Sequence, residues 1–109
     1  MNKYTELSDF EVNKKVAEKL GLAYEVTRYG VVTRMSNKEQ WREFNPCNNP
    51  TDAMPIIIEN KLILSPRYDS DEWISESMFY HDIYSVNKNP LRAAMEVFLI
   101  MKDEENKND

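Results

Sequence analysis

The chain has 109 residues, 41% of them hydrophobic, and a formal net charge of −5. This length allows one domain with a core of ordinary size, but not separate catalytic and regulatory halves. The acidic balance argues against direct nucleic-acid binding, which needs concentrated Lys and Arg to displace the counterions of the phosphates. One cysteine, no basic-then-apolar leader and no apolar run near the roughly 20 residues that span a bilayer predict a soluble protein of a reducing cytoplasm.

The first predicted element is a helix from Asp9 to Leu20. Ser8 is placed to cap it, Glu11 can complete a capping box, and Gly21 is suited to end it in the left-handed conformation. The apolar positions have helical spacing and predict one buried stripe, formed by Val12, Val16, Ala17 and Leu20.

The next segment, Ala23–Met35, is rich in β-branched and aromatic residues, which predicts strand structure. Gly30 interrupts it, and two interpretations fit: a hairpin that turns at Tyr29-Gly30, or one long strand with a bulge there. The polar residues Ser36–Glu39 that follow predict a turn.

The stretch WREFNPCNNPTDAMPIII, residues 41–58, concentrates two Asn-Pro pairs and the only cysteine. Asn49-Pro50 predicts a helix start, because the asparagine can accept a first-turn amide and proline suits the first helical position. Pro55 is unfavourable inside a helix. Its position predicts either a kinked helix or one short turn followed by an extended Ile56–Ile58, and we favour a short or kinked helix through Asn60.

The second half predicts less regular structure. Lys61–Ser65 is a strand candidate stopped by Pro66, and Arg67–Glu76 has the polar, acidic composition of a long loop. Met78–Val86 can supply a further strand or hairpin.

Asn89-Pro90 predicts the start of the last helix by the same device as Asn49-Pro50, and both segments read Asn-Pro-x-x-Ala. We interpret the match as reuse of a capping solution rather than as a repeat architecture. The helix has one apolar face, formed by Leu91, Ala94, Met95, Phe98 and Met101, which is widened by Val97, Leu99 and Ile100. The sequence therefore predicts that it is mostly buried or that it contacts another chain, such as a second copy. Residues 1–102 would form a single domain and residues 103–109 a solvated acidic tail.

Catalytic and metal-binding patterns are weak. Cys47, His81 and Asp82 are the only set that could supply a nucleophile, a base and an orienting acid, and no recognisable motif surrounds the cysteine. We expect a buried Cys47, a surface His81 and no catalytic residue. Zinc sites need several Cys and His residues at short spacing, and the acidic run at 69–72 lacks the glycine and glutamate of a calcium loop, so we expect neither metal nor cofactor.

The strongest candidate for ligand binding is electrostatic. The helix starts at Asn49 and Asn89 would each present free amides and a partial positive charge, and arginines lie near both in the sequence. A phosphate-bearing ligand or a partner's carboxylate could be held there by Trp41, Arg42, Asn45, Asn48, Asn49 and Arg92. The plainer interpretation, which we favour, is that the arginines are surface ions and the aromatic side chains belong to the core.

Three blocks of this sequence resemble the NinX-like family of small bacteriophage proteins. They are LSDFEVNKKVA at residues 7–17, FNPCNNPTDAMPIIIEN at residues 44–60 and NPLRAAMEVFL at residues 89–99. The family has no established activity, so no catalytic residue is carried over. The chain is also similar, more loosely, to phage "ABA sandwich" domains, in which an antiparallel sheet lies between helices. The resemblance implies a phage-encoded protein acting in the bacterial cytoplasm.

These observations predict an α+β fold in which one short antiparallel sheet, built from Ala23–Met35, Lys61–Ser65 and Met78–Val86, is packed between helices. The leading functional hypothesis is a non-enzymatic phage accessory protein that binds a host or phage macromolecule, with the last helix as the contact or homo-oligomer surface. The alternative is a small-ligand binder that sequesters a nucleotide-like signal at the asparagine-rich loop.

Overall fold

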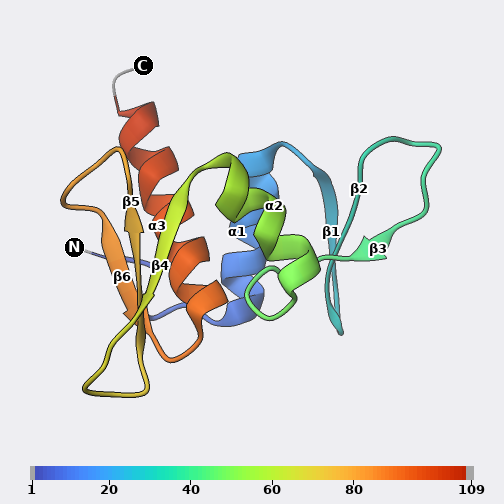
Figure 1. Cartoon of the computed structure of the whole chain (residues 1–109). Helices are drawn as coiled ribbons and strands as arrows, with labels where there is room; N and C mark the ends of the chain where they lie inside the picture. The colour runs from blue at the N-terminus through green and yellow to red at the C-terminus, as the bar shows by residue number, and fades with distance from the viewer. Residues whose placement is uncertain (1, 108–109) are drawn as a thin grey trace.

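In the computed structural model, which describes residues 2–107, the chain forms three helices and two three-stranded antiparallel sheets (Figure 1). In chain order the elements are α1 (Asp9–Leu20), β1 (Ala23–Thr27), β2 (Gly30–Arg34), β3 (Arg42–Glu43), α2 (Pro50–Glu59), β4 (Leu62–Pro66), β5 (Trp73–Ser77), β6 (Tyr84–Asn87) and α3 (Pro90–Asn106).

The helices lie between the two sheets. One face of the β4–β5–β6 sheet packs on α3, α1 packs beside α3, and the β1–β2–β3 sheet lies against α1 (Figure 1). The α+β class and the antiparallel pairing are confirmed, but the single sheet between helices is wrong. Strands joined by short connections pair locally, and α2 separates the first three strands from the last three, so each group closes its own sheet.

The local signals around α1 are confirmed. Ser8 and Glu11 form the capping box, and Gly21 ends the helix with φ at 73°. The predicted stripe needs one correction: Leu20 is 37% exposed, whereas Asn13 is buried beside the apolar residues. Asn13 can be buried because its side-chain amide bonds to Asn45 and Cys47, in the loop before α2.

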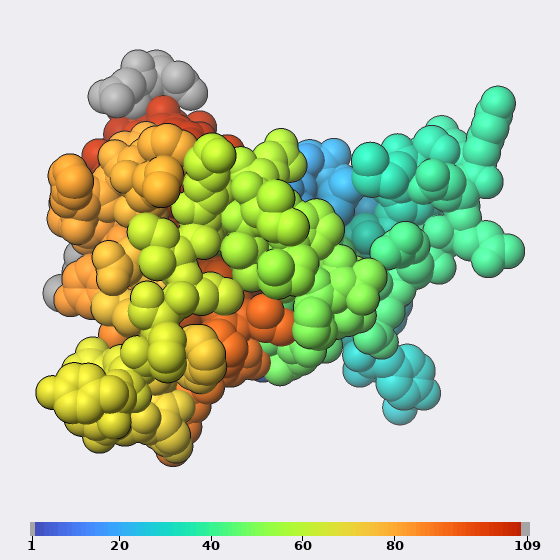
Figure 2. All heavy atoms as spheres, viewed as in Figure 1, coloured from blue at the N-terminus to red at the C-terminus, as the bar shows by residue number. Residues whose placement is uncertain are grey.

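The segment Ala23–Met35, for which the sequence predicts either a hairpin or a bulged strand, is a hairpin. Thr27 pairs with Gly30 across a two-residue turn at Arg28-Tyr29, and Gly30 has φ at 145°, a conformation that L side chains rarely adopt. The hairpin and the predicted turn at Ser36–Glu39 project from one end of the molecule (Figure 2).

The helix at Asn49-Pro50 continues through Pro55 to Glu59, with Asn60 as its C-cap. Pro55 cannot donate to the carbonyl of Thr51, but both residues are exposed, so water can bond to that carbonyl. The predicted short helix, which ends at its C-cap Asn60, is therefore confirmed. The alternative, an extended Ile56–Ile58, is wrong.

In the second sheet β4 is confirmed, although it includes Pro66. The predicted loop at Arg67–Glu76 is confirmed for residues 67–72, which connect β4 to β5, but it is wrong for the rest, because Trp73–Ser77 is the central strand of this sheet. Of its inward positions, Ser75 and Ser77 are buried and Trp73 is half-buried. Small polar residues facing a helix do not produce the apolar alternation that identifies a strand in a sequence. Residues 78–83 connect β5 to the strand β6, the only strand that Met78–Val86 supplies.

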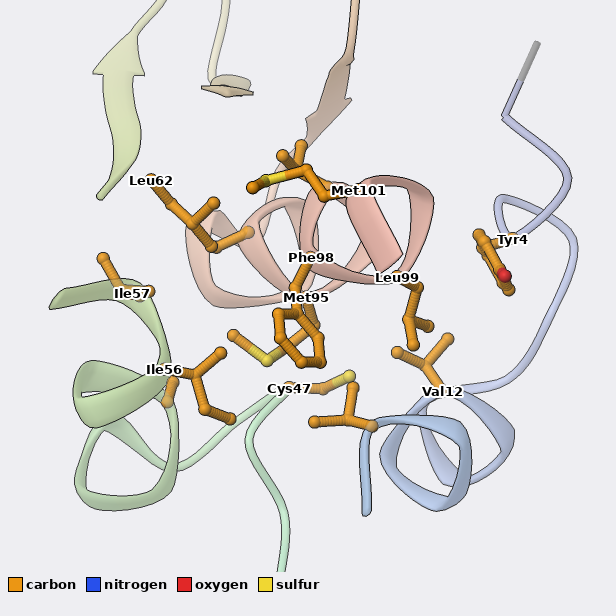
Figure 3. Close-up of a cluster of buried hydrophobic side chains, with 14 of the residues drawn as sticks. Tyr4, Val12, Cys47, Ile56, Ile57, Leu62, Met95, Phe98, Leu99 and Met101 are labelled. Carbon is orange, nitrogen blue, oxygen red and sulfur yellow. The ribbon is translucent and has the colours of Figure 1, made fainter. Parts of the chain in front are cut away.

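Most of the core surrounds α3. Every residue from Arg92 to Leu99 is buried, and side chains from α1, α2, β4 and the loop before α2 gather around Met95, Phe98 and Leu99 (Figure 3). Helix α3 is therefore mostly buried within its own chain, which is the first of the two predictions for it. The helix also continues through Asn106, into the predicted tail, and residues 108–109 of that tail lie outside the described residues.

Candidate functional site

The asparagine-rich residues 45–49, called the Asn loop below, form a tight turn between β3 and α2. The amides of Asn48 and Asn49 donate to the carbonyl of Asn45 at 3.1 and 2.8 Å. Pro46 and Cys47, in the middle of the turn, are fully buried. The loop therefore points its small apolar side chains into the core and leaves its amide side chains at the margin.

Helix α1 holds one side of the Asn loop. Asn13 donates through Nδ2 to Oδ1 of Asn45 at 2.8 Å, and its own Oδ1 accepts the amide of Cys47 at 3.1 Å. Asn48 donates to Oδ1 of Asn45 and to Oδ2 of Asp9, both at 3.1 Å. Because buried or half-buried amides are costly when unpaired, these bonds fix the register between α1 and the loop.

The start of α3 holds the other side. Asn89 caps α3 by accepting the amides of Leu91 and Arg92 at 2.9 and 3.3 Å. Its Nδ2 donates in the opposite direction, to the carbonyl of Cys47 at 2.7 Å and to Oδ1 of Asn48 at 3.1 Å. Asn49, in contrast, only caps α2, by accepting the amide of Thr51 at 3.0 Å. The reuse of Asn-Pro as a capping device is confirmed, and one of the two caps also clamps the loop.

The guanidinium of Arg92 is engaged in bonds to other residues of the same chain. Its guanidinium pairs with Asp9 through Nη1 and with Glu96 through Nε, both at 2.6 Å. Nη2 donates to the carbonyls of Tyr4 and Leu7 at 3.0 and 2.7 Å. Burial opposes the charge, but the bonds from Asp9 and Glu96 outweigh it and raise the pKa of Arg92.

The carboxylate of Glu96 is equally occupied. Besides Arg92 it accepts the hydroxyl of Ser85 at 2.6 Å and the side-chain amide of Asn2 at 2.7 Å. The cluster joins the N-terminal segment, α1, α3 and β6 through side chains that are far apart in the sequence. An external anion would have to displace these bonds to reach Arg92.

The other predicted cation and its aromatic neighbour lie elsewhere. Arg42 is at 3.8 Å from Asp52, whose second oxygen accepts the amide of Asn45 at 2.9 Å. Asp52 therefore supplies the negative charge near the start of α2. Trp41 stacks against the guanidinium of Arg34, with 4.3 Å from its Cζ to a ring centroid.

Two of the six predicted ligand residues, Asn45 and Asn48, line a common cavity. Its volume is about 150 Å³, and Asp9, Asn13, Tyr29 and Phe44 also line it. Small-molecule sites usually enclose about 300–1,000 Å³. The remaining four residues (Trp41, Arg42, Asn49 and Arg92) are engaged with Arg34, Asp52, the start of α2 and the buried ion pairs.

Sequence reasoning missed five residues of this network, namely Asn2, Asp9, Asn13, Ser85 and Glu96, and it gave Asn89 only the role of a helix start. Two of them do leave a signal in the sequence. Asn13 lies beside Val12 in the apolar stripe of α1, and Glu96 interrupts the apolar run of α3. A polar residue in a buried stripe requires a partner, and Arg92 is one turn before Glu96, so an internal ion pair could have been predicted.

Cys47 is buried between the first and last helices. Burial, with further contributions from Asp9 and Glu96 that outweigh Arg92, raises the pKa of its thiol to about 12. His81 and Asp82 lie in the exposed connection between β5 and β6. The buried Cys47 and the surface His81 that we expected are therefore confirmed. Within residues 2–107, no three His, Cys, Asp or Glu side chains group as metal ligands would.

The fold and the network define a small α+β domain in which the amide and charged groups of the Asn loop and the α3 start bond mainly to one another. The chain belongs to the bacteriophage P22 NinX family, because the family model described as "Bacteriophage P22, NinX" matches residues 3–102. The resemblance drawn from the three sequence blocks is thereby confirmed. Comparison with curated proteins gives no match.

Proposed function

We propose that this chain is a non-enzymatic phage accessory protein that acts in the bacterial cytoplasm by binding a host or phage macromolecule. Membership of a bacteriophage family supports the accessory role. The described part of the chain contains no helix long and apolar enough to cross a membrane. The high pKa of Cys47 and the internal bonds of Arg92 argue that neither residue acts in chemistry.

The observation that carries this proposal is a partly exposed, largely apolar sheet face. The register of β4, β5 and β6 places Leu64, Ser75 and Ser85 on the face that packs on α3. The opposite face, called the outer face below, carries Ile63, Ser65, Ile74, Glu76, Tyr84 and Val86. Ile63 is 36% and Tyr84 56% exposed. Apolar sheet faces of this kind are typical contact surfaces of small proteins.

The outer face replaces the last helix as the proposed contact surface. The apolar residues of α3 are largely buried within this chain, so that helix has little apolar surface left for a partner. Because the outer face has one carboxylate, Glu76, among apolar and hydroxyl side chains, it suits a partner surface that is apolar with few charges.

A capture experiment from phage-infected cells tests this proposal. The tagged wild-type chain should retain a specific partner, and Ile63→Arg should lose it, because a charge on the outer face has to be desolvated on binding. The matched control is Ile58→Arg, which places the same charge at a more exposed position on α2. Equal capture by the wild type and both variants would exclude the outer face as the contact surface.

The alternative function, a small-ligand binder for a nucleotide-like anion at the Asn loop, has less support. Its cavity is small and its strongest cation, Arg92, already bonds to two carboxylates. Thermal-shift measurements against nucleotides test it directly. A nucleotide-dependent rise in Tm that Asn48→Ala removes would favour this function over macromolecule binding.

A further inference from the structure

Strand β6 has one free edge, and its register shows which residues form it. The amide of Ser77 donates to the carbonyl of Ile83 at 3.1 Å, and Ser75 lies opposite Ser85. In an antiparallel ladder alternate residues bond to the neighbouring strand, so the odd-numbered residues of β6 bond to β5. The amides and carbonyls of Tyr84 and Val86 therefore point away from the sheet.

This edge is open in the described part of the chain. No backbone group outside the sheet bonds to Tyr84 or Val86 among residues 2–107. The N-terminal segment meets β6 through a side chain, because Asn2 donates to the hydroxyl of Ser85 at 2.9 Å. A cavity of about 240 Å³ lies beside the strand, lined in part by Asn2, Tyr84 and Val86. The strand itself runs along one margin of the molecule (Figure 1).

We propose that two copies of this chain associate by antiparallel pairing of β6 with β6 of the partner, about a two-fold axis at Ser85. Tyr84 then lies opposite the partner subunit's Val86, and Val86 opposite the partner subunit's Tyr84. Each pair exchanges two backbone hydrogen bonds, so the edge gains four. Both pairs also place an aromatic ring beside a β-branched side chain on the outer face, a favourable cross-strand combination.

The charges at the ends of β6 favour the same register. Asp82 lies in the turn before β6 and Lys88 in the bend after it, so the same register brings Asp82 to the side of the partner subunit's Lys88, and the two-fold axis repeats this pair. Lys88 is 3.7 Å from Asp71 in the single chain, and both side chains are largely exposed, so this surface pair is weak and readily exchanged. A register shifted by one residue in either direction loses this match of opposite charges.

The other long edges are less suited to self-pairing. In β4 the backbone groups of Leu62, Leu64 and Pro66 are the ones that point away from β5, and Pro66 has no amide to donate. The equivalent pairing of β1 about its central residue would set Glu25 directly against its own copy, which like charges disfavour. Among these three edges, β6 alone combines free amides with complementary charges.

The pairing makes one six-stranded sheet and doubles the outer face. Because each strand contributes only four residues, the contact is smaller than a standard protein interface. The expected dissociation constant is therefore on the order of 10 µM to 1 mM. The average mass in solution should rise from 12.9 kDa towards twice that value as the protein concentration increases across this range. The rise should be less steep at high salt, since the charge pairs are exposed.

Sedimentation velocity over this concentration range tests the proposal, with a charge-swap set at the two ends of β6. Asp82→Lys and Lys88→Asp should each weaken dimerisation about tenfold, because each sets like charges opposite one another. The double variant Asp82→Lys with Lys88→Asp should restore it. Asp69→Lys, which makes the same charge change in the β4–β5 loop, is the matched control and should leave the dissociation constant unchanged.

Val86→Pro tests the backbone bonds separately. It removes an outward amide and spares the bonds of Ser85 and Asn87 to β5, so the fold should persist by circular dichroism while dimers disappear. A strict monomer at about 1 mM wild-type chain would overturn the proposal. Dimers that the charge swap and Val86→Pro leave unchanged would overturn it equally, because they would form through another surface.

Discussion

Arg92 and Glu96, one helical turn apart in α3, form an ion pair with 2.6 Å between Nε and Oε2, and their side chains are only 8% and 1% exposed. Burying both charges is costly, and the pair is tolerated because nearly every donor and acceptor has a partner. Through these partners α3 is fixed to Asp9 of α1, to the carbonyls of Tyr4 and Leu7 and to Ser85 of β6. The pair therefore determines how α1, the N-terminal segment and β6 are held against α3.

Arg92→Ala should lower the free energy of unfolding by about 3–5 kcal/mol, because it leaves the Glu96 carboxylate buried and uncompensated. Urea unfolding measures this loss. Replacing both residues, by Arg92→Met with Glu96→Leu, should cost less than Arg92→Ala alone, since no buried charge remains. Arg42→Ala, at the exposed arginine near α2, should cost at most about 0.5 kcal/mol. A loss for Arg92→Ala as small as that control would contradict a structural role for the pair.

The two Asn-Pro caps should differ in their contribution to stability. Asn49→Ala should cost about 1 kcal/mol, the usual value of a cap. Asn89→Ala should cost about 2–3 kcal/mol, because it also removes the bonds to Cys47 and Asn48 and leaves the carbonyl of Cys47 unpaired. Chemical denaturation of both variants under one set of conditions provides the comparison. Equal losses would show that the clamp on the Asn loop adds nothing to capping.

Tyr4 should make the fold sensitive to alkali. Burial, helped by a hydrogen bond to Asp103, raises the pKa of Tyr4 above its ordinary value of about 10. The folded state thus keeps its proton where the unfolded state loses it. Stability is fully present below about pH 10 and falls as pH rises above that value. In Tyr4→Phe the free energy of unfolding should fall less steeply with rising pH. Unfolding curves between about pH 9 and 11 measure the difference.

Asp103 should make the stability of the fold depend on pH under acidic conditions. Burial tends to raise the pKa of Asp103, but Tyr4, Lys3 and Lys19 lower it below the ordinary value of about 3.9. Its contribution is present above that value and is lost as pH falls through the lower folded pKa. The slope of stability against pH below about 4 should therefore be shallower in Asp103→Asn than in the wild type. Parallel slopes would refute this assignment.

The thiol of Cys47 should be unreactive in the native state. With its pKa raised to about 12 and its side chain buried, almost no thiolate is present or accessible at neutral pH. Ellman's reagent should label the folded chain only as fast as it unfolds, and labelling in urea should be immediate. Rapid labelling without denaturant would instead require a reactive, accessible thiol. A Cys47→Ala variant serves as the control for reagent background.

The helix ends could be predicted from short stretches of sequence. The capping box at Ser8 and Glu11, the glycine after α1 and the two Asn-Pro starts are local devices, and each is formed as expected. A cap bonds to amides two or three residues away, so its geometry depends on neighbours in the sequence rather than on the rest of the fold. The family resemblance rests largely on these same blocks.

The grouping of the strands and the partners of the polar residues depend on the packing of distant segments. Ser75 and Ser77 form a central strand because α3 covers them, and no local pattern of large apolar residues announces that. Arg92 bonds to Asp9 from 83 positions away and Asn2 to Glu96 from 94. The helices, the acidic balance and the family could be predicted from the residues alone. That Arg92 and the Asn loop hold the fold together depends on contacts between distant segments, because only folding brings those groups within bonding distance.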